Sequence, residues 1–185
     1  AGVEVALRGL SLIGQGGNHG VYMSNGAKLS IENCLIANFA VNGIRVGTPA
    51  TVRIVDSLLR DNHIGIQLNG GATAIATGNG IHGGYIGVYV YTNSATTVTT
   101  ATVRDAAISG AVYGVAVQAS TFPTAASHLT LSNSVVTLNT VYGLYQSADS
   151  GAAATLESPG NNTVRRNGSS PADNTYGTIT PVPPI

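Results

Sequence analysis

The sequence has few charged residues, one cysteine and no tryptophan. Charged residues make up 9% of its 185 residues, and eight Lys and Arg balance eight Asp and Glu. In ordinary soluble domains roughly a quarter of the residues are charged. Because the chain has no basic excess, it lacks the electrostatic signature of a nucleic-acid-binding protein. It also lacks the polybasic run that attaches a protein to anionic lipid.

Long apolar runs are missing as well. No stretch reaches the roughly 18 apolar residues of a membrane-spanning helix, and the chain opens on a strand-like segment, AGVEVALRGL, without a signal peptide. Apolar residues nevertheless make up 43% of the chain, which argues against intrinsic disorder. We therefore expect one folded domain that does not insert into a membrane.

The single cysteine, Cys34, lies in the apolar run CLIANF. One cysteine excludes an intrachain disulfide and a cysteine-based zinc cluster. Its sequence neighbours supply no positive charge that would activate a thiolate. We therefore expect Cys34 to be a small buried hydrophobic residue.

The chain does contain a repeat, in which a glycine is followed by alternating apolar residues. The repeats lie 22 to 29 residues apart and begin at Gly20, Gly43, Gly65, Gly87, Gly114 and, in a weaker copy, Gly143. A second short apolar stretch precedes each glycine, as in IENCLIA and IVDSLLR. Alternation with period two and abundant β-branched residues predict short strands, while Gly, Asn, Asp and Ser between them predict tight turns.

A unit of this length cannot bury its own apolar face, but stacked units bury a continuous core. The repeat therefore predicts an all-β fold, a single-stranded parallel β-helix of about six or seven coils. An antiparallel sandwich would show the same alternation, but it would not need the same phrase at regular intervals. We expect the β-helix to occupy residues 1–156. Residues 157–185, which end in PVPPI, are expected to form a partial coil and a cap or tail.

Aligning the repeats predicts which residues stack above one another. One inward column holds Leu7, Ile31, Ile54, Ala76, Val103 and Leu131. A second inward column holds Val21, Ile44, Ile66, Val88, Val115 and Leu144. A turn column holds Gly9, Asn33, Asp56, Gly78, Asp105 and Asn133. Gly, Asn and Asp tolerate left-handed backbone angles, so we interpret this column as turn geometry rather than as a catalytic site.

The outward column on the glycine-containing strands is the candidate binding surface. It contains Tyr22, Arg45, Gln67, Tyr89, Ala116 and Tyr145, with Tyr91 two residues beyond Tyr89. Aromatic rings cover the apolar face of a sugar, while amide and guanidinium groups bond its hydroxyls. We therefore predict glycan binding by Tyr22, Arg45, Gln67, Tyr89, Tyr91 and Tyr145. The alternative is that tyrosine simply favours strands and covers the outer surface.

The acidic residues are too scattered to predict a hydrolytic or a metal site. Glycoside hydrolysis usually needs two carboxylates roughly 5–10 Å apart, and no two of the eight acids align in neighbouring coils. Calcium needs several converging carboxylates. Glu32 aligns with Arg8 of the previous coil and is expected to form an exposed ion pair of little energetic value. We predict no catalytic residue, no metal site and no cofactor.

The nearest approach to a reactive cluster is Arg60, Asp61 and His63, with His82 one coil later. Such a cluster has a general base and a cation that β-elimination would use. A solvated turn is the simpler interpretation of the same residues.

Several phrases resemble the right-handed parallel β-helix repeat proteins with the pectin-lyase-like fold, many of them bacterial and exported. These phrases are VALRGLSLIGQGGNHGVYM, LSIENCLIANFAVNGIRV and VRIVDSLLRDNHIGIQL, and the closing ESPGNNTVRRNG is similar to the SxGNNxxxGN ending of such proteins. The resemblance covers about residues 5–168. It implies right-handed coils and an exported location, either periplasmic, extracellular or on the cell surface. It implies no activity, because the clustered calcium-binding aspartates and catalytic arginine of pectate lyases have no counterpart that the sequence places.

Three functions follow as hypotheses. The first is a non-catalytic module that binds a polysaccharide or a cell-surface glycan through the outward column. The second is a polysaccharide lyase or glycoside hydrolase that uses Arg60, Asp61, His63 and His82. The third is a structural module that assembles end to end, because open coil ends expose strand edges.

Overall fold

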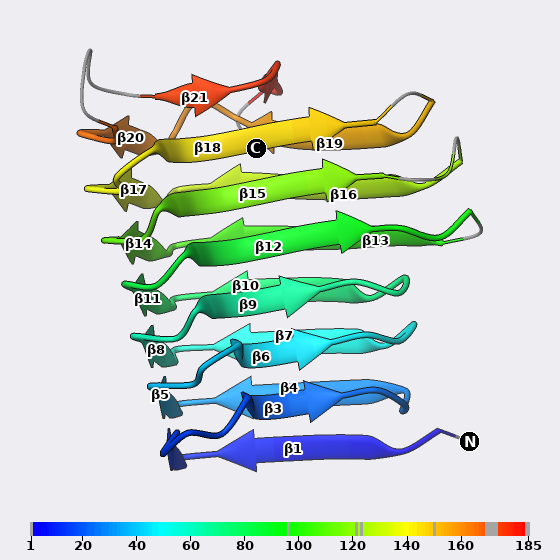
Figure 1. Cartoon of the computed structure of the whole chain (residues 1–185), viewed down its shortest axis with the longest axis vertical. Coiled ribbons are helices and arrows are strands. Elements are labelled where there is room, and N and C mark those ends of the chain that lie inside the picture. The colour runs from blue at the N-terminus through cyan, green and yellow to red at the C-terminus, as the bar shows by residue number, and fades with distance from the viewer. Residues whose placement is uncertain are drawn as a thin grey trace.

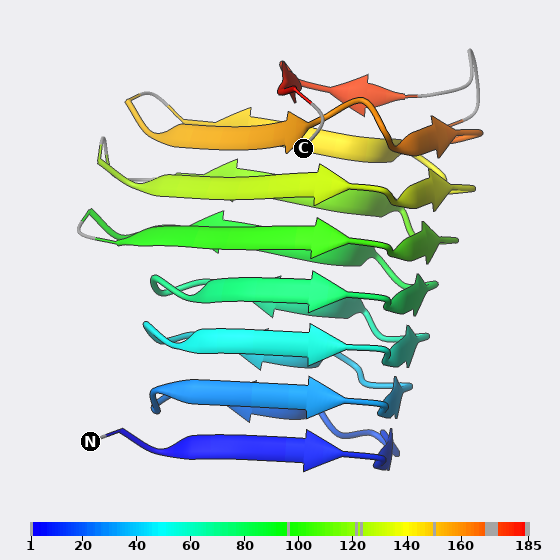
Figure 2. The same cartoon turned by 180° about the vertical axis from the view of Figure 1, so that it is seen from behind.

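The computed structural model describes residues 2–95, 97–120, 122, 124–149, 151–168 and 174–183. These residues form three parallel β-sheets, and each coil contributes one strand to every sheet (Figures 1 and 2). They contain no helix, and therefore none long and apolar enough to cross a membrane. The predicted all-β parallel solenoid is thus confirmed.

The three sheets are named A, B and C in the order in which the chain visits them. Sheet A contains β1 (Glu4–Arg8), β4 (Lys28–Glu32), β7 (Thr51–Val55), β10 (Thr73–Thr77), β13 (Val98–Arg104), β16 (Ala126–Ser132), β19 (Ala153–Ser158) and β22 (Thr180–Pro181). Sheet B contains β2 (Ser11–Ile13), β5 (Leu35–Ala37), β8 (Leu58–Arg60), β11 (Gly80–His82), β14 (Ala107–Ser109), β17 (Val135–Thr137) and β20 (Thr163–Arg165). Sheet C contains β3 (His19–Met23), β6 (Asn42–Val46), β9 (Ile64–Leu68), β12 (Ile86–Thr92), β15 (Tyr113–Ala119), β18 (Tyr142–Ala148) and β21 (Thr175–Tyr176).

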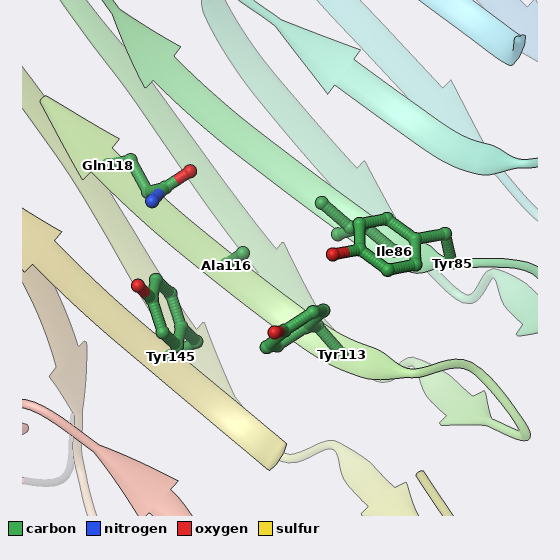
Figure 3. A pocket seen from close by; sticks show the side chains of 6 residues that line it. All are labelled: Tyr85, Ile86, Tyr113, Ala116, Gln118 and Tyr145. Carbon is green, nitrogen blue, oxygen red and sulfur yellow. The ribbon is translucent and has the colours of Figure 1, made fainter. Parts of the chain in front are cut away.

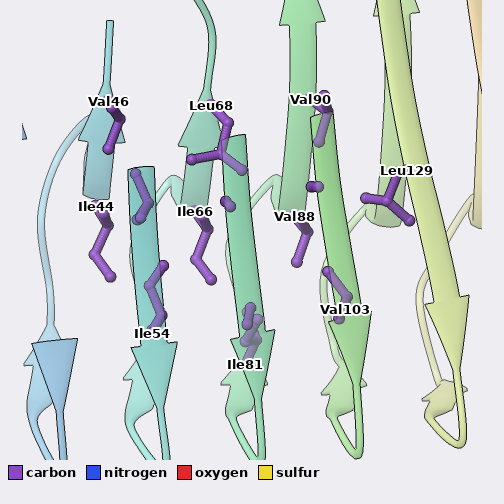
Figure 4. Close-up of a cluster of buried hydrophobic side chains, with 14 of the residues drawn as sticks. Ile44, Val46, Ile54, Ile66, Leu68, Ile81, Val88, Val90, Val103 and Leu129 are labelled. Carbon is purple, nitrogen blue, oxygen red and sulfur yellow. The ribbon is translucent and has the colours of Figure 1, made fainter. Parts of the chain in front are cut away.

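The core contains the two inward columns that the aligned repeats predicted, together with others such as the sheet B column of Ile36, Leu59, Ile81, Ile108 and Val136. On sheet A the register pairs Ile31 with Ile54, and on sheet C it pairs Ile44 with Ile66 and Ile66 with Val88. These side chains are buried in one continuous cluster along the axis of the solenoid (Figure 4). Each coil therefore completes the hydrophobic layer of the coil beside it, as stacked repeats require.

The turn between sheets A and B has the left-handed geometry that its composition predicted. The φ angles of Asn33, Asp56, Asp105 and Asn133 lie between 45° and 54°. Glycine occupies the same place in the first and fourth coils, with φ of 63° at Gly9 and 69° at Gly78. The column is thus explained by backbone conformation.

The glycine of the repeat is explained by close packing rather than by its φ angle. A Cβ atom added at Gly65 would lie 2.5 Å from the carbonyl oxygen of Gly87, and one at Gly87 would lie 2.5 Å from that of Gly114. Any side chain at these positions would separate two neighbouring coils. This glycine column brings the start of each sheet C strand against the next.

Buried polar side chains link neighbouring coils at the turns. Asn62 is buried, accepts a hydrogen bond from the backbone N–H of Phe39 and donates through Nδ2 to the carbonyl oxygen of Ile36. Asn139 accepts a hydrogen bond from the backbone N–H of Ala111 and donates through Nδ2 to Oδ1 of Asn167, at 2.9 Å. These amides satisfy backbone groups that leave the sheets, as buried polar groups require. Cys34 is 3% exposed, which confirms its predicted burial.

Strands continue past residue 156, where the repeat fades. β20 pairs with β17, β21 pairs with β18, and β22 pairs with β19, so each sheet gains one further strand. The strands of sheet C also lengthen along the chain, from five residues in β9 to seven in β12, β15 and β18. These longer strands extend sheet C on the side of the connections to sheet A (Figure 1). The connections there include residues 96, 121 and 123, which lie outside the described residues.

Candidate functional site

All eight tyrosines of the chain belong to the strands of sheet C or directly precede one. They are Tyr22, Tyr85, Tyr89, Tyr91, Tyr113, Tyr142, Tyr145 and Tyr176. Sheets A and B contain none. We call the outer side of sheet C that these residues occupy the tyrosine face.

The register of sheet C places the predicted outward residues in one column. Tyr22 pairs with Arg45, Arg45 with Gln67, and Gln67 with Tyr89. The column continues through Ala116 to Tyr145. The structure adds Tyr176, which follows Tyr145 in β21 and which the sequence repeat did not reach.

A second column, nearer the start of the strands, was missed by the sequence analysis. It aligns Ile86 with Tyr113 and Tyr113 with Tyr142, while Tyr85 lies directly before β12. These residues precede the repeat glycine, where the alternation used to assign inward and outward positions is interrupted. The clustering of all the tyrosines in one half of each repeat was the signal that would have found them.

The aromatic rings form a connected cluster over the later coils. The ring centroids of Tyr85 and Tyr113 lie 5.4 Å apart in an edge-on arrangement, and those of Tyr113 and Tyr145 lie 5.3 Å apart. Tyr145 and Tyr176 stack at 4.9 Å, with their planes only 12° apart. Such pairs fix the rings in place and stabilise a preformed aromatic surface.

A pocket of about 190 Å³ opens among these rings. Its floor is Ala116, which pairs with Tyr89 on one side and Tyr145 on the other. The walls of this Ala116 pocket are Tyr85, Ile86, Tyr113, Tyr145 and Gln118 (Figure 3). The hollow exists because the smallest side chain of the column is set between two of the largest.

Gln118 separates the Ala116 pocket from a second hollow of about 270 Å³. Tyr89, Tyr91, Ser147 and Asp149 line the second hollow with it. The Tyr89 hydroxyl donates to Oε1 of Gln118 at 2.7 Å, and within the described residues Nε2 of Gln118 has no protein partner. An amide N–H₂ group is thus held at the boundary of both hollows, oriented by the tyrosine.

The hydroxyls of Tyr89 and Tyr113 are held in their neutral form. Burial raises the pKa of Tyr89 well above its ordinary value, and the neighbouring Tyr91 and Tyr145 raise it further. The pKa of Tyr113 is also raised, first by burial and then by a hydrogen bond with Tyr85. Neutral hydroxyls both donate and accept hydrogen bonds, so these residues remain able to bond sugar-like hydroxyls.

The earlier coils make the tyrosine face polar. The Arg45 guanidinium lies over the Tyr22 ring, with Cζ 5.2 Å from the centroid. Asn42 is fully buried and donates through Nδ2 to Oε1 of Gln67 at 2.8 Å. His19 pairs with Asn42 in the register and contacts the Tyr22 ring.

Four buried polar atoms of this region lack a hydrogen-bond partner within the described residues. They are Nδ1 of His19, Oδ1 of Asn42, Nε of Arg45 and Oδ1 of Asn69. A buried polar group without a partner costs about 1–3 kcal/mol, so such groups are rare away from functional sites. All four lie at this end of sheet C, so hydrogen-bonding capacity beneath the tyrosine face is left unused there.

The alternative cluster of Arg60, Asp61, His63 and His82 divides into two groups. Nη1 of Arg60 is paired with Oδ2 of Asp61 at 2.7 Å, and Arg60 lies beside His82 in sheet B. Nδ1 of His82 lies 2.8 Å from the Ser109 hydroxyl.

His63 belongs to the other group, because its ring stacks on Tyr85 with centroids 5.2 Å apart. Among the described residues no hydrogen bond, ion pair or ring contact joins His63 to His82. The intervening Asn62 is a buried structural residue. Arg60 and His82 thus lie in sheet B, whereas Asp61 and His63 lie in the turn after β8, and no interaction among the described residues joins all four.

Carboxylates do not converge within the described residues either. No group of three or more His, Cys, Asp or Glu side chains there could hold a metal ion. Glu32 forms the predicted ion pair with Arg8, with Oε2 3.0 Å from Nε, and a second pair with Arg53. The tyrosine face presents rings, amides and hydroxyls at its surface.

Comparison with known proteins identifies the repeat. A family model described as a right-handed β-helix region matches residues 7–169. Neither the curated proteins nor the solved structures gave a match to the chain.

Proposed function

The chain belongs to the right-handed β-helix family, and from that premise we propose that it is a non-catalytic module that binds a polysaccharide or cell-surface glycan on its tyrosine face. Because this fold supports several unrelated functions, the proposal rests on the chemistry of the face and not on the fold. It also places the protein where such glycans lie, in the periplasm, outside the cell or on the cell surface.

The Ala116 pocket is the observation that carries the proposal. Tyr113 and Tyr145 present ring surface on which the apolar face of a sugar stacks. Nε2 of Gln118, at the rim, is a donor for a sugar hydroxyl. Aromatic walls with a few fixed polar groups are a common composition of small-ligand sites.

The polar half of the face supports a ligand that extends over several coils. Sugar hydroxyls both donate and accept, so they match the half-buried amides of Gln67 and Asn69 and the guanidinium of Arg45. This region and the Ala116 pocket lie on the same sheet, in successive coils. A chain of sugar units along the axis of the solenoid would contact both.

The charge of sheet C favours a hydroxyl-rich ligand over a polyanion. Arg45 is the only Lys, Arg, Asp or Glu in the seven strands of the sheet. A surface with one cation provides little electrostatic attraction for a chain of negative charges. We therefore propose that neutral sugar units occupy most of the tyrosine face.

Calorimetric titration with a panel of neutral oligosaccharides tests the proposal. The variants Tyr145→Ala, which removes a wall, and Ala116→Leu, which fills the pocket, should each weaken binding about tenfold or more. Val135→Ala is the matched control, because Val135 is 44% exposed on sheet B, away from the tyrosine face.

Equal affinity of the wild type and both pocket variants would show that the ligand binds elsewhere. An absence of binding across the whole panel would contradict the proposed function itself. Circular dichroism of each variant checks that the fold is retained.

A further inference from the structure

A depression of about 310 Å³ lies on the outer side of sheet A, a different sheet from that of the tyrosine face. Its floor is β10, whose outward residues Thr73, Ile75 and Thr77 are short. Longer side chains rise on both sides, Arg53 from β7 and Arg104 from β13. Neighbouring parallel strands lie about 4.8 Å apart, so the two arginines are separated by roughly 10 Å along the axis.

Arg104 leans over this floor and has no acidic partner. Its Nε donates to Oγ1 of Thr77 at 3.0 Å, which tilts the guanidinium toward the coil of β10. No ion pair involves Arg104 within the described residues. The adjacent carboxylate of Asp105 instead accepts a hydrogen bond from Asn133. The two terminal nitrogens of Arg104 are therefore left as an unoccupied fork of donors.

The opposite side of the depression carries a second, partly compensated positive charge. Glu32 is paired with both Arg53 and Arg8. A hydrogen bond from the Ser30 hydroxyl, together with the two arginines, lowers the pKa of Glu32, so this carboxylate is ionised at neutral pH. Arg8, Arg53 and Arg104 thus share this part of sheet A with the carboxylate of Glu32, and the carboxylates of Asp56 and Asp105 lie in the turn directly after the strands. The free fork of Arg104, and not a net charge, is therefore what the depression offers to an anion.

We propose that the depression is a second binding site, specific for a carboxylate carried on a hydroxylated ring the size of one sugar. The Arg104 fork matches the two oxygens of a carboxylate. Ile75, which is 49% exposed on the floor, contacts the apolar side of the ring, and the hydroxyls of Thr73 and Thr77 bond its polar edge. Arg53 adds to the positive field and is the weaker contact, because Glu32 already holds it.

Calorimetric titration of the whole chain with glucuronate, against glucose as the neutral analogue and acetate as the bare anion, tests this site. Glucuronate should bind more tightly than either, and its affinity should fall as salt is added. Arg104→Gln should weaken glucuronate binding at least about tenfold, and Arg53→Gln should weaken it less. Arg165→Gln makes the same charge change on sheet B, where the side chain is exposed, and should leave the affinity unchanged.

Glucose binding as tightly as glucuronate would overturn the role of the carboxylate. Equal binding of acetate would overturn the role of the ring and leave only a general anion contact. Equal losses in Arg104→Gln and Arg165→Gln would overturn the location. Tyr145→Ala leaves the depression on sheet A intact, so this variant should bind glucuronate as the wild type does. That result distinguishes this proposal from the one for the tyrosine face.

Discussion

At the scale of single residues, backbone conformation and close contacts decide which side chains each position accepts. Asn33 adopts a φ of 52°, which side chains other than Gly, Asn and Asp rarely adopt. Gly65 has no room for a Cβ atom, because one would lie 2.5 Å from a backbone oxygen of the next coil. The first constraint could be predicted from the residue types in the column. The second could not, because it depends on the distance between coils.

Replacing Asn33 by valine tests the turn column. A β-branched residue at this φ should reduce the free energy of unfolding by about 1–2 kcal/mol or more. Asn33→Gly is the control and should change stability far less, because glycine occupies the same position in two other coils. Urea denaturation measures both variants, and equal losses would contradict a conformational origin.

Glu32 predicts how stability changes in acid. Its pKa is lower in the folded protein than the ordinary value of 4.5, first through the Ser30 hydrogen bond and then through Arg8 and Arg53. Its contribution to stability is therefore present above pH 4.5 and is lost as the pH falls through the lowered pKa. Denaturant melts of the wild type at pH 7 and at about pH 3 should differ more than those of Glu32→Gln. A variant with the same loss in acid would contradict this assignment.

At the scale of strands, the columns follow from the repeat because parallel pairing fixes which residues lie side by side. The aligned sequence thus predicted a column with the order Tyr22, Arg45, Gln67, Tyr89, Ala116 and Tyr145. The strand pairing of sheet C has the same order. It failed at Tyr113 and Tyr142, which precede the repeat glycine, where strict alternation does not hold. The unpartnered atoms of Asn42 and Arg45 were also beyond prediction, because they depend on side-chain orientation.

Ile66 tests the contribution of one core column. It is 1% exposed in β9, between Ile44 and Val88 of the neighbouring coils. Ile66→Ala should reduce the free energy of unfolding by about 2–5 kcal/mol, because it leaves a cavity between two neighbouring coils. Val135→Ala, at an exposed position, should change it by less than about 0.5 kcal/mol. Similar losses in both variants would be inconsistent with a column that holds the coils together.

The tyrosine face predicts an alkaline titration that differs from that of free tyrosine. Because burial raises the pKa of Tyr89 and Tyr113 above 10.0 in the folded protein, both should ionise later than exposed tyrosines. The stability linked to their neutral forms is present below pH 10 and is lost as the pH rises through the raised values. Ultraviolet titration of the wild type and Tyr89→Phe checks this, and the variant should lack one of the latest transitions.

At the scale of the whole molecule, stability depends on contacts between adjacent coils. Central strands such as β9 pair on both sides, whereas β1 pairs only with β4 within the described residues. In such linear assemblies the end units open more readily than the middle.

Hydrogen exchange should therefore be faster in β1 than in the central strands β9 and β12. Mass spectrometry of peptides from each coil measures the difference. Uniform protection from β1 to β12 would show that the solenoid unfolds as one cooperative unit instead.

The connections from sheet C to sheet A have a consequence for how this molecule can change. They range from four residues (69–72) to six (120–125), yet the strands on either side of the longer connections keep their pairing. The strand pairing alone thus sets the position of each coil along the axis. A longer connection adds residues only at one edge of the solenoid. New recognition segments can be added coil by coil at fixed heights, without the compensating changes that an insertion in a closed barrel would demand.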